Sequence, residues 1–191
     1  MDNASILNFI FEAGILKRVK RSGWWMTGVS NPETVADHSF RTALLGYFLA
    51  SLENADKYKV LMMCLMADMP EARINDQHKV ANRYLNLREA EKNAYIDQVA
   101  SLGENIKKEL LDFKEEYDAQ ATIESIIARD ADILECLFQA KEYSDSGFPV
   151  AKKFFRKGPD NLKTKSARAL CEKLSNTDTT LWWENISKFD R

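Results

Sequence analysis

Turn-forming residues are scarce in this chain, and their scarcity limits the folds that it can adopt. The 191 residues include seven glycines and four prolines. Between these breaks the apolar residues recur every three or four positions, which is the period of an amphipathic helix, and no stretch alternates convincingly like a strand. The sequence therefore predicts an all-α helical bundle, and its length predicts a single domain over residues 1–191.

Apolar spacing and helix-breaking residues divide the chain into a series of expected helices. Residues 19–33 and 71–88 are polar or irregular and separate some of these helices from their neighbours. The expected helices cover about 4–18, 34–53, 56–69, 88–100, 103–118 and 120–144, with shorter ones after the Gly147-Phe148-Pro149 break.

Composition narrows the class of protein. Hydrophobic residues make up 45% of the chain, charged residues 29%, and the net charge is −2. These values are ordinary for a soluble globular protein and favour neither a nucleic acid polymer nor a membrane as partner. Cys64, Cys136 and Cys171 are widely spaced, as expected of reduced thiols in a cytoplasmic protein. We find no signal peptide or membrane-spanning run.

A helix start precedes one of the two histidines. Asn31-Pro32 ends an irregular segment, and Thr34 with Asp37 three residues later forms the pattern of a capping box. His38 then lies one turn inside the expected helix. Taken alone, such a histidine is more often a satisfied interior residue than a metal ligand.

Two further stretches contain carboxylates in apolar surroundings. Asp68 shares a helix face with Leu61 and Leu65, so it either needs a cation or merely ends the helix at the surface. Asp130 and Asp132 are two residues apart and so point to different faces, and Arg129 could pair with one of them at the surface.

His38, Asp68 and Asp132 come from three separate helices and could converge as nitrogen and oxygen ligands. This mixture of donors suits manganese, iron, cobalt, nickel or zinc better than calcium. Spacing along the sequence does not by itself show that the three side chains meet.

Three blocks that each contain acidic residues follow one another along the chain: Thr34–Arg41, Met66–Ala72 with Asp76 after it, and Asp130–Asp132 continuing to Gln139–Tyr143. In this order and spacing they resemble the HD-domain phosphohydrolases. More closely, the chain resembles the small 5′-nucleotidase subgroup that includes the bacterial 5′-deoxyribonucleotidases, over about Leu16 to Tyr143. The resemblance implies the helical bundle of that family.

The resemblance also implies a role for each matching residue. His38, Asp68 and Asp132 match metal ligands of the family. Glu71 matches an acidic residue implicated in catalysis, and Asp76 matches a second acid near the nucleotide. The cofactor would be a divalent transition metal that activates water for attack on phosphorus.

Basic and aromatic side chains are the candidates for substrate contact. Arg18, Arg21 and Lys79 could neutralise phosphate charge, although a solvated surface position would explain each equally well. Trp24 lies in a segment similar to one that contacts the nucleotide in the family. Either Trp24 or Trp25 could pack on sugar or base, but two aromatics in a loop also serve as core anchors.

Ala67 departs from the family pattern, which has a metal-binding histidine at this position. A methyl group has no lone pair to donate, so one ligand is missing. Either the histidine was deliberately replaced to inactivate the enzyme, or the chain is a naturally degenerate paralogue. Because the other site positions are retained, we favour the inactivated His-to-Ala variant.

The function that these residues predict is removal of phosphate from nucleotides. The substrate could be a nucleoside monophosphate, or a di- or triphosphate dephosphorylated stepwise, including a modified nucleotide of antibiotic biosynthesis such as the oxetanocin-A pathway. The alternative is a non-catalytic nucleotide-binding or regulatory paralogue. A homodimer is compatible with either function.

Overall fold

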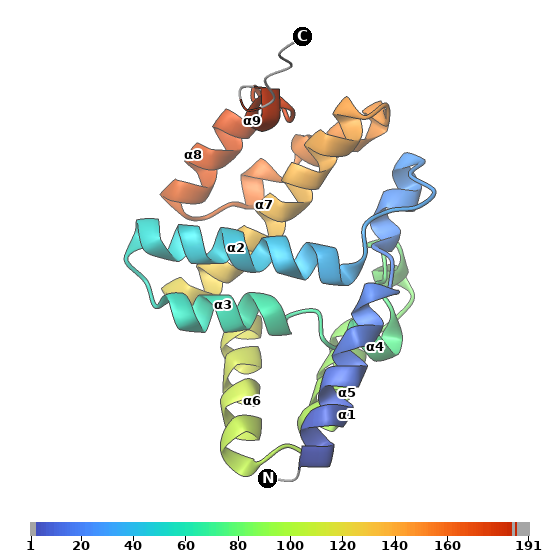
Figure 1. Cartoon of the computed structure of the whole chain (residues 1–191), viewed down its shortest axis with the longest axis vertical. Coiled ribbons are helices and arrows are strands. Elements are labelled where there is room, and N and C mark those ends of the chain that lie inside the picture. Colours follow the sequence, from blue (N-terminus) through green and yellow to red (C-terminus); the bar gives the residue numbers. More distant parts are fainter. Residues whose placement is uncertain (1–2, 185, 187–191) are drawn as a thin grey trace.

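The structure is a computed structural model that describes residues 3–184 and 186, and every regular element in this part of the chain is helical (Figure 1). This confirms the predicted all-α class. The α-helices are α1 (Asn3–Ala13), α2 (Val35–Glu53), α3 (Lys57–Met66), α4 (Glu71–Ile74), α5 (Leu87–Val99), α6 (Glu104–Ala119), α7 (Ile123–Asp145), α8 (Lys165–Leu174) and α9 (Leu181–Glu184). Short 3-10 helices connect them: η1 (Gly14–Lys17), η2 (Ser22–Thr27), η3 (Ala81–Arg83), η4 (Pro149–Arg156) and η5 (Pro159–Asn161).

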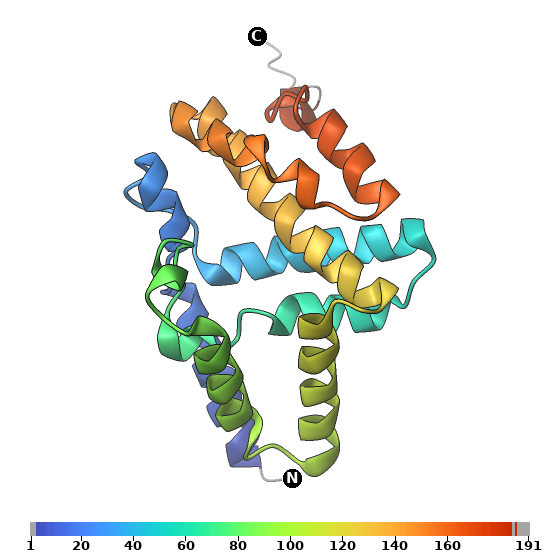
Figure 2. The ribbon, with the colours of Figure 1, turned by 180° about the vertical axis from the view of Figure 1, so that it is seen from behind.

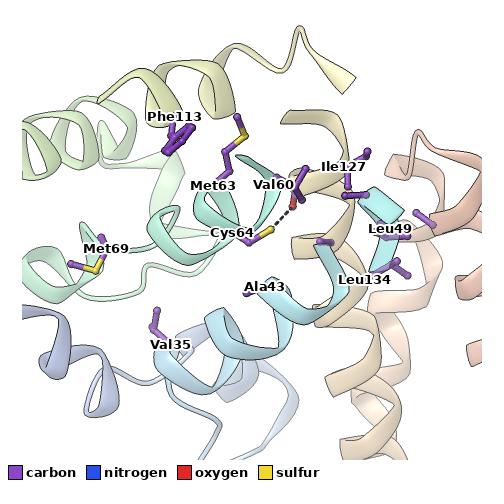
Figure 3. Close-up of a cluster of buried hydrophobic side chains, with 14 of the residues drawn as sticks. Val35, Ala43, Leu49, Val60, Met63, Cys64, Met69, Phe113, Ile127 and Leu134 are labelled. Atoms are coloured by element: carbon purple, nitrogen blue, oxygen red, sulfur yellow. Dashed lines mark hydrogen bonds between the residues drawn. The ribbon is translucent and has the colours of Figure 1, made fainter. Parts of the chain in front are cut away.

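Helix α2 is the element around which the others are arranged. It packs against α3 and α7 and also contacts η1 and α8. In the view of Figure 1 it crosses in front of α7, and the reverse view places α7 in front (Figure 2). Fully buried apolar side chains from these helices form the core (Figure 3), including Leu49, Val60, Ile127 and Leu134.

Local signals explain where these helices begin and end. The capping box that precedes His38 is present: the Asp37 backbone N–H donates to Thr34 Oγ1 over 3.2 Å, and the Thr34 N–H donates to Asp37 Oδ2 over 2.8 Å. Helix α2 ends at Asn54 in a left-handed conformation, with φ of 56°. Gly147 follows α7 with φ of 100°, which glycine adopts without steric cost.

Two expected helices are shorter than their apolar patterns. Helix α1 ends at Ala13 and continues only as the 3-10 turn η1, and α3 ends at Met66 rather than near residue 69. After Met66 the backbone bonds span three residues, as in the 3.3 Å bond from Met69 N–H to Met66 O, which is the spacing of turns. Asp68 therefore lies in a turn after the helix, where our prediction had placed it inside one.

None of the helices in the described ranges has both the length and the apolar character required to cross a membrane.

Helix α2 packs tightly against α3 and α7 at Gly46. A Cβ atom added there would lie 2.7 Å from Cys64 Sγ, 3.0 Å from Val60 Cγ1 and 3.8 Å from Ala131 Cβ. The first two atoms belong to α3 and the third to α7. Glycine at this point of α2 therefore lets three helices pack at a distance that any larger residue would increase.

We expect Gly46→Ala to destabilise the fold, although alanine is the better helix former. Overpacking a core costs about 1–3 kcal/mol, whereas the gain in helix propensity is about 1 kcal/mol. The measurement is the free energy of unfolding in urea. Cys64→Ala is the matched background, because removing Sγ frees the nearest atom. If Gly46→Ala costs as much in that background as in the native chain, the contact with Cys64 is not the cause.

Candidate functional site

One imidazole and two carboxylates converge near the start of α2, the end of α3 and the middle of α7. His38 Nε2 lies 3.1 Å from Asp132 Oδ1 and 3.5 Å from Asp68 Oδ2. His38 is buried, while the two carboxylates are partly exposed. The structure thus brings together the three residues that the sequence suggested as metal ligands, although Asp68 reaches the site from a turn.

The other ring nitrogen of His38 determines how the imidazole is oriented. Nδ1 is hydrogen-bonded to Oε2 of Glu135, a fully buried carboxylate whose Oε1 accepts a 2.9 Å bond from Arg41 Nε. Burial lowers the pKa of His38, but its hydrogen bonds to Asp132 and Glu135 raise the pKa well above the ordinary value. The arrangement directs Nε2 at Asp68 and Asp132, as a carboxylate partner directs a metal-binding histidine.

Our sequence reasoning did not give Glu135 a role. It lies three residues after Asp132, on the same face of α7 one turn later. A carboxylate three residues after Asp132 was the one sequence feature that could have indicated a role for Glu135. Its partner His38 is 97 residues away in the sequence, so the pairing itself could not be predicted.

Arg21 provides positive charge beside these acids. Its Nη1 lies 3.2 Å from Asp76 Oδ2 and 3.8 Å from Asp68 Oδ2, and its Nη2 donates to Cys136 Sγ over 3.1 Å. Asp76 Oδ1 also accepts bonds from the backbone N–H and the hydroxyl of Ser22, at 2.7 and 2.6 Å. Asp76, predicted as catalytic, thus anchors the segment that contains Arg21, as a structural carboxylate does.

Glu71 lies beside the same cluster with one oxygen unsatisfied. Its Oε2 is buried and has no hydrogen-bond partner among the described residues. Burial, followed by the negative charges of Asp68 and Asp76, raises the pKa of Glu71 to about 10. At neutral pH its carboxyl is therefore protonated and can donate a proton, which is the property of a general acid.

The two aspartates on α7 have separate functions. Asp132 Oδ2 accepts a 2.8 Å bond from Arg129, whose guanidinium also lies 3.4 Å from the Tyr117 hydroxyl. Although burial opposes it, the hydrogen bond from His38 and the charge of Arg129 lower the pKa of Asp132 below its usual range. Asp130 is buried and accepts bonds from Thr164 and from the Lys163 N–H, so it fixes the start of α8.

The remaining predicted substrate contacts are not assembled at this cluster. Arg18 and Lys79 are exposed, and the hydrogen bonds and ion pairs described for residues 3–184 do not connect either to the site. Trp24 is 2% exposed and lies 4.5 Å from the Phe154 ring and 5.2 Å from the Tyr143 ring, measured between centroids. Its indole therefore serves as a core anchor, which corrects the expectation that it faces a substrate.

The donors present are compatible with a divalent cation. His38 Nε2 and two carboxylates face one another, and a cation can replace the proton that Nε2 otherwise carries between them. The unsatisfied Oε2 of Glu71 lies in the same group of acids. Ala67 adds no donor; it lines a crevice, too narrow for water, with Met63, Met66, Phe113, Lys114 and Tyr117.

A second group of potential donors, His38, Glu135 and Cys136, has ligand atoms within 4.8 Å of one another. We do not assign the metal to it. Both oxygens of Glu135 are already bonded, and burial raises the pKa of the Cys136 thiol to about 11, so it is not a thiolate at neutral pH.

Comparison with known proteins identifies the family. Residues 13–170 match the HD domain, and the chain belongs to that family. It is 33% identical over 150 residues to the 5′-deoxynucleotidase HDDC2 of Dictyostelium discoideum, covering 73% of this chain and 78% of that protein. The human protein of the same name is 33% identical over 144 residues, covering 74% of this chain and 69% of its own length.

A solved structure supports the fold. A conserved hypothetical protein from Pyrococcus furiosus superposes with a TM-score of 0.77 at 33% identity, covering 90% of this chain and 99% of its own.

Glu33, at the edge of the site, makes stability depend on pH. Its Oε1 accepts a 2.8 Å bond from Trp24 Nε1. Burial, and then the charge of Glu135, raise the pKa of Glu33 to about 7. The unfolded chain, with a pKa of about 4.3, loses this proton first, so the contribution of the protonated carboxyl to stability declines as pH rises from about 4.3 to 7.

We therefore expect Glu33→Gln to be more heat-stable than the native chain at pH 8 and to lose this advantage near pH 4. The amide oxygen can still accept the Trp24 bond but carries no charge. Circular dichroism melts from pH 4 to 8 measure the effect, and Glu109→Gln, on the exposed surface, is the control. Parallel pH curves for Glu33→Gln and the native chain would contradict the assignment.

Proposed function

We propose that the protein is a metal-dependent phosphohydrolase that removes phosphate from nucleotides, with His38, Asp68 and Asp132 as its metal ligands. The observation that carries the proposal is the convergence of these three side chains near Glu71, whose buried Oε2 has no hydrogen-bond partner among the described residues. The names of the similar 5′-deoxynucleotidases support a deoxynucleotide 5′-phosphate as substrate. Cobalt, manganese, iron, nickel and zinc suit the donors.

The residues of the site divide the chemistry between them. A bound divalent cation would supply Lewis acidity and lower the pKa of water. Glu135 holds His38 in the orientation that exposes Nε2, and Arg21 provides positive charge near the phosphate. As water adds to phosphorus and the bond to the 5′ oxygen breaks, Glu71 gives its proton to the leaving oxygen.

A specific observation favours a second candidate, a nucleotide-binding protein without catalysis. Ala67 leaves only three of the family's ligands, and Asp132 is already paired with Arg129 at 2.8 Å. Such a site could bind a nucleotide while holding metal only weakly. The two functions predict different outcomes when a histidine is placed at position 67.

We expect Ala67→His to bind about one equivalent of metal, at least about 10–100-fold more tightly than the native chain, and to release phosphate from nucleotides. Metal content by mass spectrometry and phosphate release from nucleoside mono-, di- and triphosphates are the measurements. Ala67→Leu is the control, because it adds bulk without a lone pair. An Ala67→His variant that binds metal yet hydrolyses none of these nucleotides would favour the binding-protein function.

In the Ala67→His background, we expect Glu71→Gln to lower kcat by about 10²–10⁴-fold, because glutamine cannot donate the proton that the leaving oxygen needs. Metal content should remain unchanged. Glu115→Gln, an exposed acid on α6, controls for the loss of charge alone. A parallel loss of metal and activity in Glu71→Gln would instead make Glu71 a ligand.

A further inference from the structure

Arg129 lies beside the candidate metal ligands, although the roles assigned so far give it no part in binding a substrate. Its Nη1 donates to Asp132 Oδ2 over 2.8 Å, and the other oxygen of Asp132 lies 3.1 Å from His38 Nε2. A single carboxylate therefore separates the guanidinium from the imidazole. A phosphate that binds next to this carboxylate meets Arg129 at the edge of the site.

The guanidinium of Arg129 has donors that are not in use. Its side chain makes two hydrogen bonds within the described residues, to Asp132 and, at 3.4 Å, to the Tyr117 hydroxyl, and both come from Nη1. Nε and Nη2 form another edge of the planar group and have no partner in this part of the chain. The side chain is 51% exposed, so a ligand can reach that edge. Two parallel N–H groups match two oxygens of one phosphate.

A simple surface ion pair would explain less of this geometry. The sequence alone allowed Arg129 to be such a pair, and exposed pairs contribute little to stability. Asp132, however, is only 19% exposed, and Tyr117 is partly buried. Tyr117 comes from α6, which packs against both α3 and α7 (Figure 2). Two separate helices thus hold Nη1, which fixes the guanidinium at the edge of the site.

Arg129 is better placed for a new ligand than the other guanidinium at the site. Arg21 Nη1 lies 3.8 Å from Asp68 Oδ2, but both Nη atoms of Arg21 are already bonded, to Asp76 and Cys136, and its side chain is only 16% exposed. Arg21 therefore supplies charge, whereas Arg129 also has a vacant pair of donors. A phosphate monoester carries about two negative charges at neutral pH, and donors held in place before it binds stabilise them well.

We propose that Arg129 binds the phosphate of the substrate through Nε and Nη2, while Asp132 and Tyr117 hold its guanidinium in position. The inference rests on the proposed function and extends it, because it assigns a specific phosphate contact. Arg18 and Lys79, which the sequence suggested for this role, are exposed and have no bond to the site within the described residues. The ligand is a nucleotide that ends in a phosphate monoester, since that group offers two free oxygens to one guanidinium.

Isothermal titration with deoxyadenosine 5′-monophosphate, deoxyadenosine and inorganic phosphate tests the proposal. The background protein carries Ala67→His and Glu71→Gln and is loaded with manganese, so that it binds the nucleotide but turns it over slowly. In this background we expect Arg129→Gln to weaken nucleotide binding by about 10–100-fold, the contribution of a charge-assisted hydrogen bond, and to leave deoxyadenosine binding unchanged. Arg156→Gln, at an exposed arginine of η4, controls for the loss of one positive charge.

Two further readouts separate a phosphate contact from a structural role. Manganese content should not fall in Arg129→Gln, because Arg129 is not a ligand and its removal leaves more of the charge of Asp132 to the cation. Arg129→Lys keeps the charge but cannot donate two parallel bonds, so it should lose part of the nucleotide affinity and less than Arg129→Gln does. This variant also provides the test if Arg129→Gln does not fold.

The outcomes that would overturn the inference are distinct from those that would overturn the proposed function. Equal nucleotide affinity in Arg129→Gln, in Arg129→Lys and in the background protein would reject the phosphate contact alone. A parallel loss of nucleotide and manganese would show that Arg129 acts only through Asp132, which also rejects it. Weaker binding of inorganic phosphate with unchanged nucleotide binding would make the position a site for free phosphate. A background protein that binds no nucleotide would overturn both the proposed function and the inference.

Discussion

The packing of α2 against α3 and α7 at Gly46 is the constraint on which the site depends. The three metal-ligand candidates are contributed by α2, the turn after α3, and α7, and none of these segments alone presents more than one of them. Cys64 Sγ would be 2.7 Å from a Cβ added at Gly46, and we expect a shift of the helices there to reach those positions because protein interiors are densely packed. The chemistry at one end of α2 therefore relies on the absence of a side chain in its middle.

Electrostatic balance is the second constraint. A buried carboxylate is tolerated when it is paired, hydrogen-bonded or protonated, and the site uses all three solutions. Arg21 pairs with Asp68 and Asp76, Glu135 is bonded to His38 and an arginine, and Glu71 keeps its proton. The acids thus hold the segment before α2 against the residues that follow α3, and they hold α2 against the middle of α7. The same network leaves Asp68 and Asp132 at the edge, partly exposed, where a ligand can reach them.

Local features of the site could be predicted from the sequence, whereas long-range pairings could not. The capping box at Thr34 and the helical period placed His38 correctly, because both depend on residues within one turn. Asp68 was assigned to a helix that ends earlier, since apolar period does not reveal the change to turn hydrogen bonds. The bonds of Asp76 to Ser22 and of Glu135 to His38 join residues 54 and 97 positions apart, and no periodicity encodes them. Trp24 showed the same limit, because only its burial against Phe154 excludes stacking on a ligand.

The partners of Asp132 bear on how a site without a histidine at position 67 would bind a cation. The two oxygens of Asp132 have different partners: Oδ1 lies 3.1 Å from His38, and Oδ2 accepts a 2.8 Å bond from Arg129. A cation that binds Oδ1 would therefore share the charge of this carboxylate with a guanidinium that is already bound to Oδ2. A fourth protein ligand would favour the cation, whereas an alanine at position 67 adds no donor. Under the proposed function, the residue at position 67 therefore sets the number of ligands, while Arg129 sets the charge that a cation meets at Asp132.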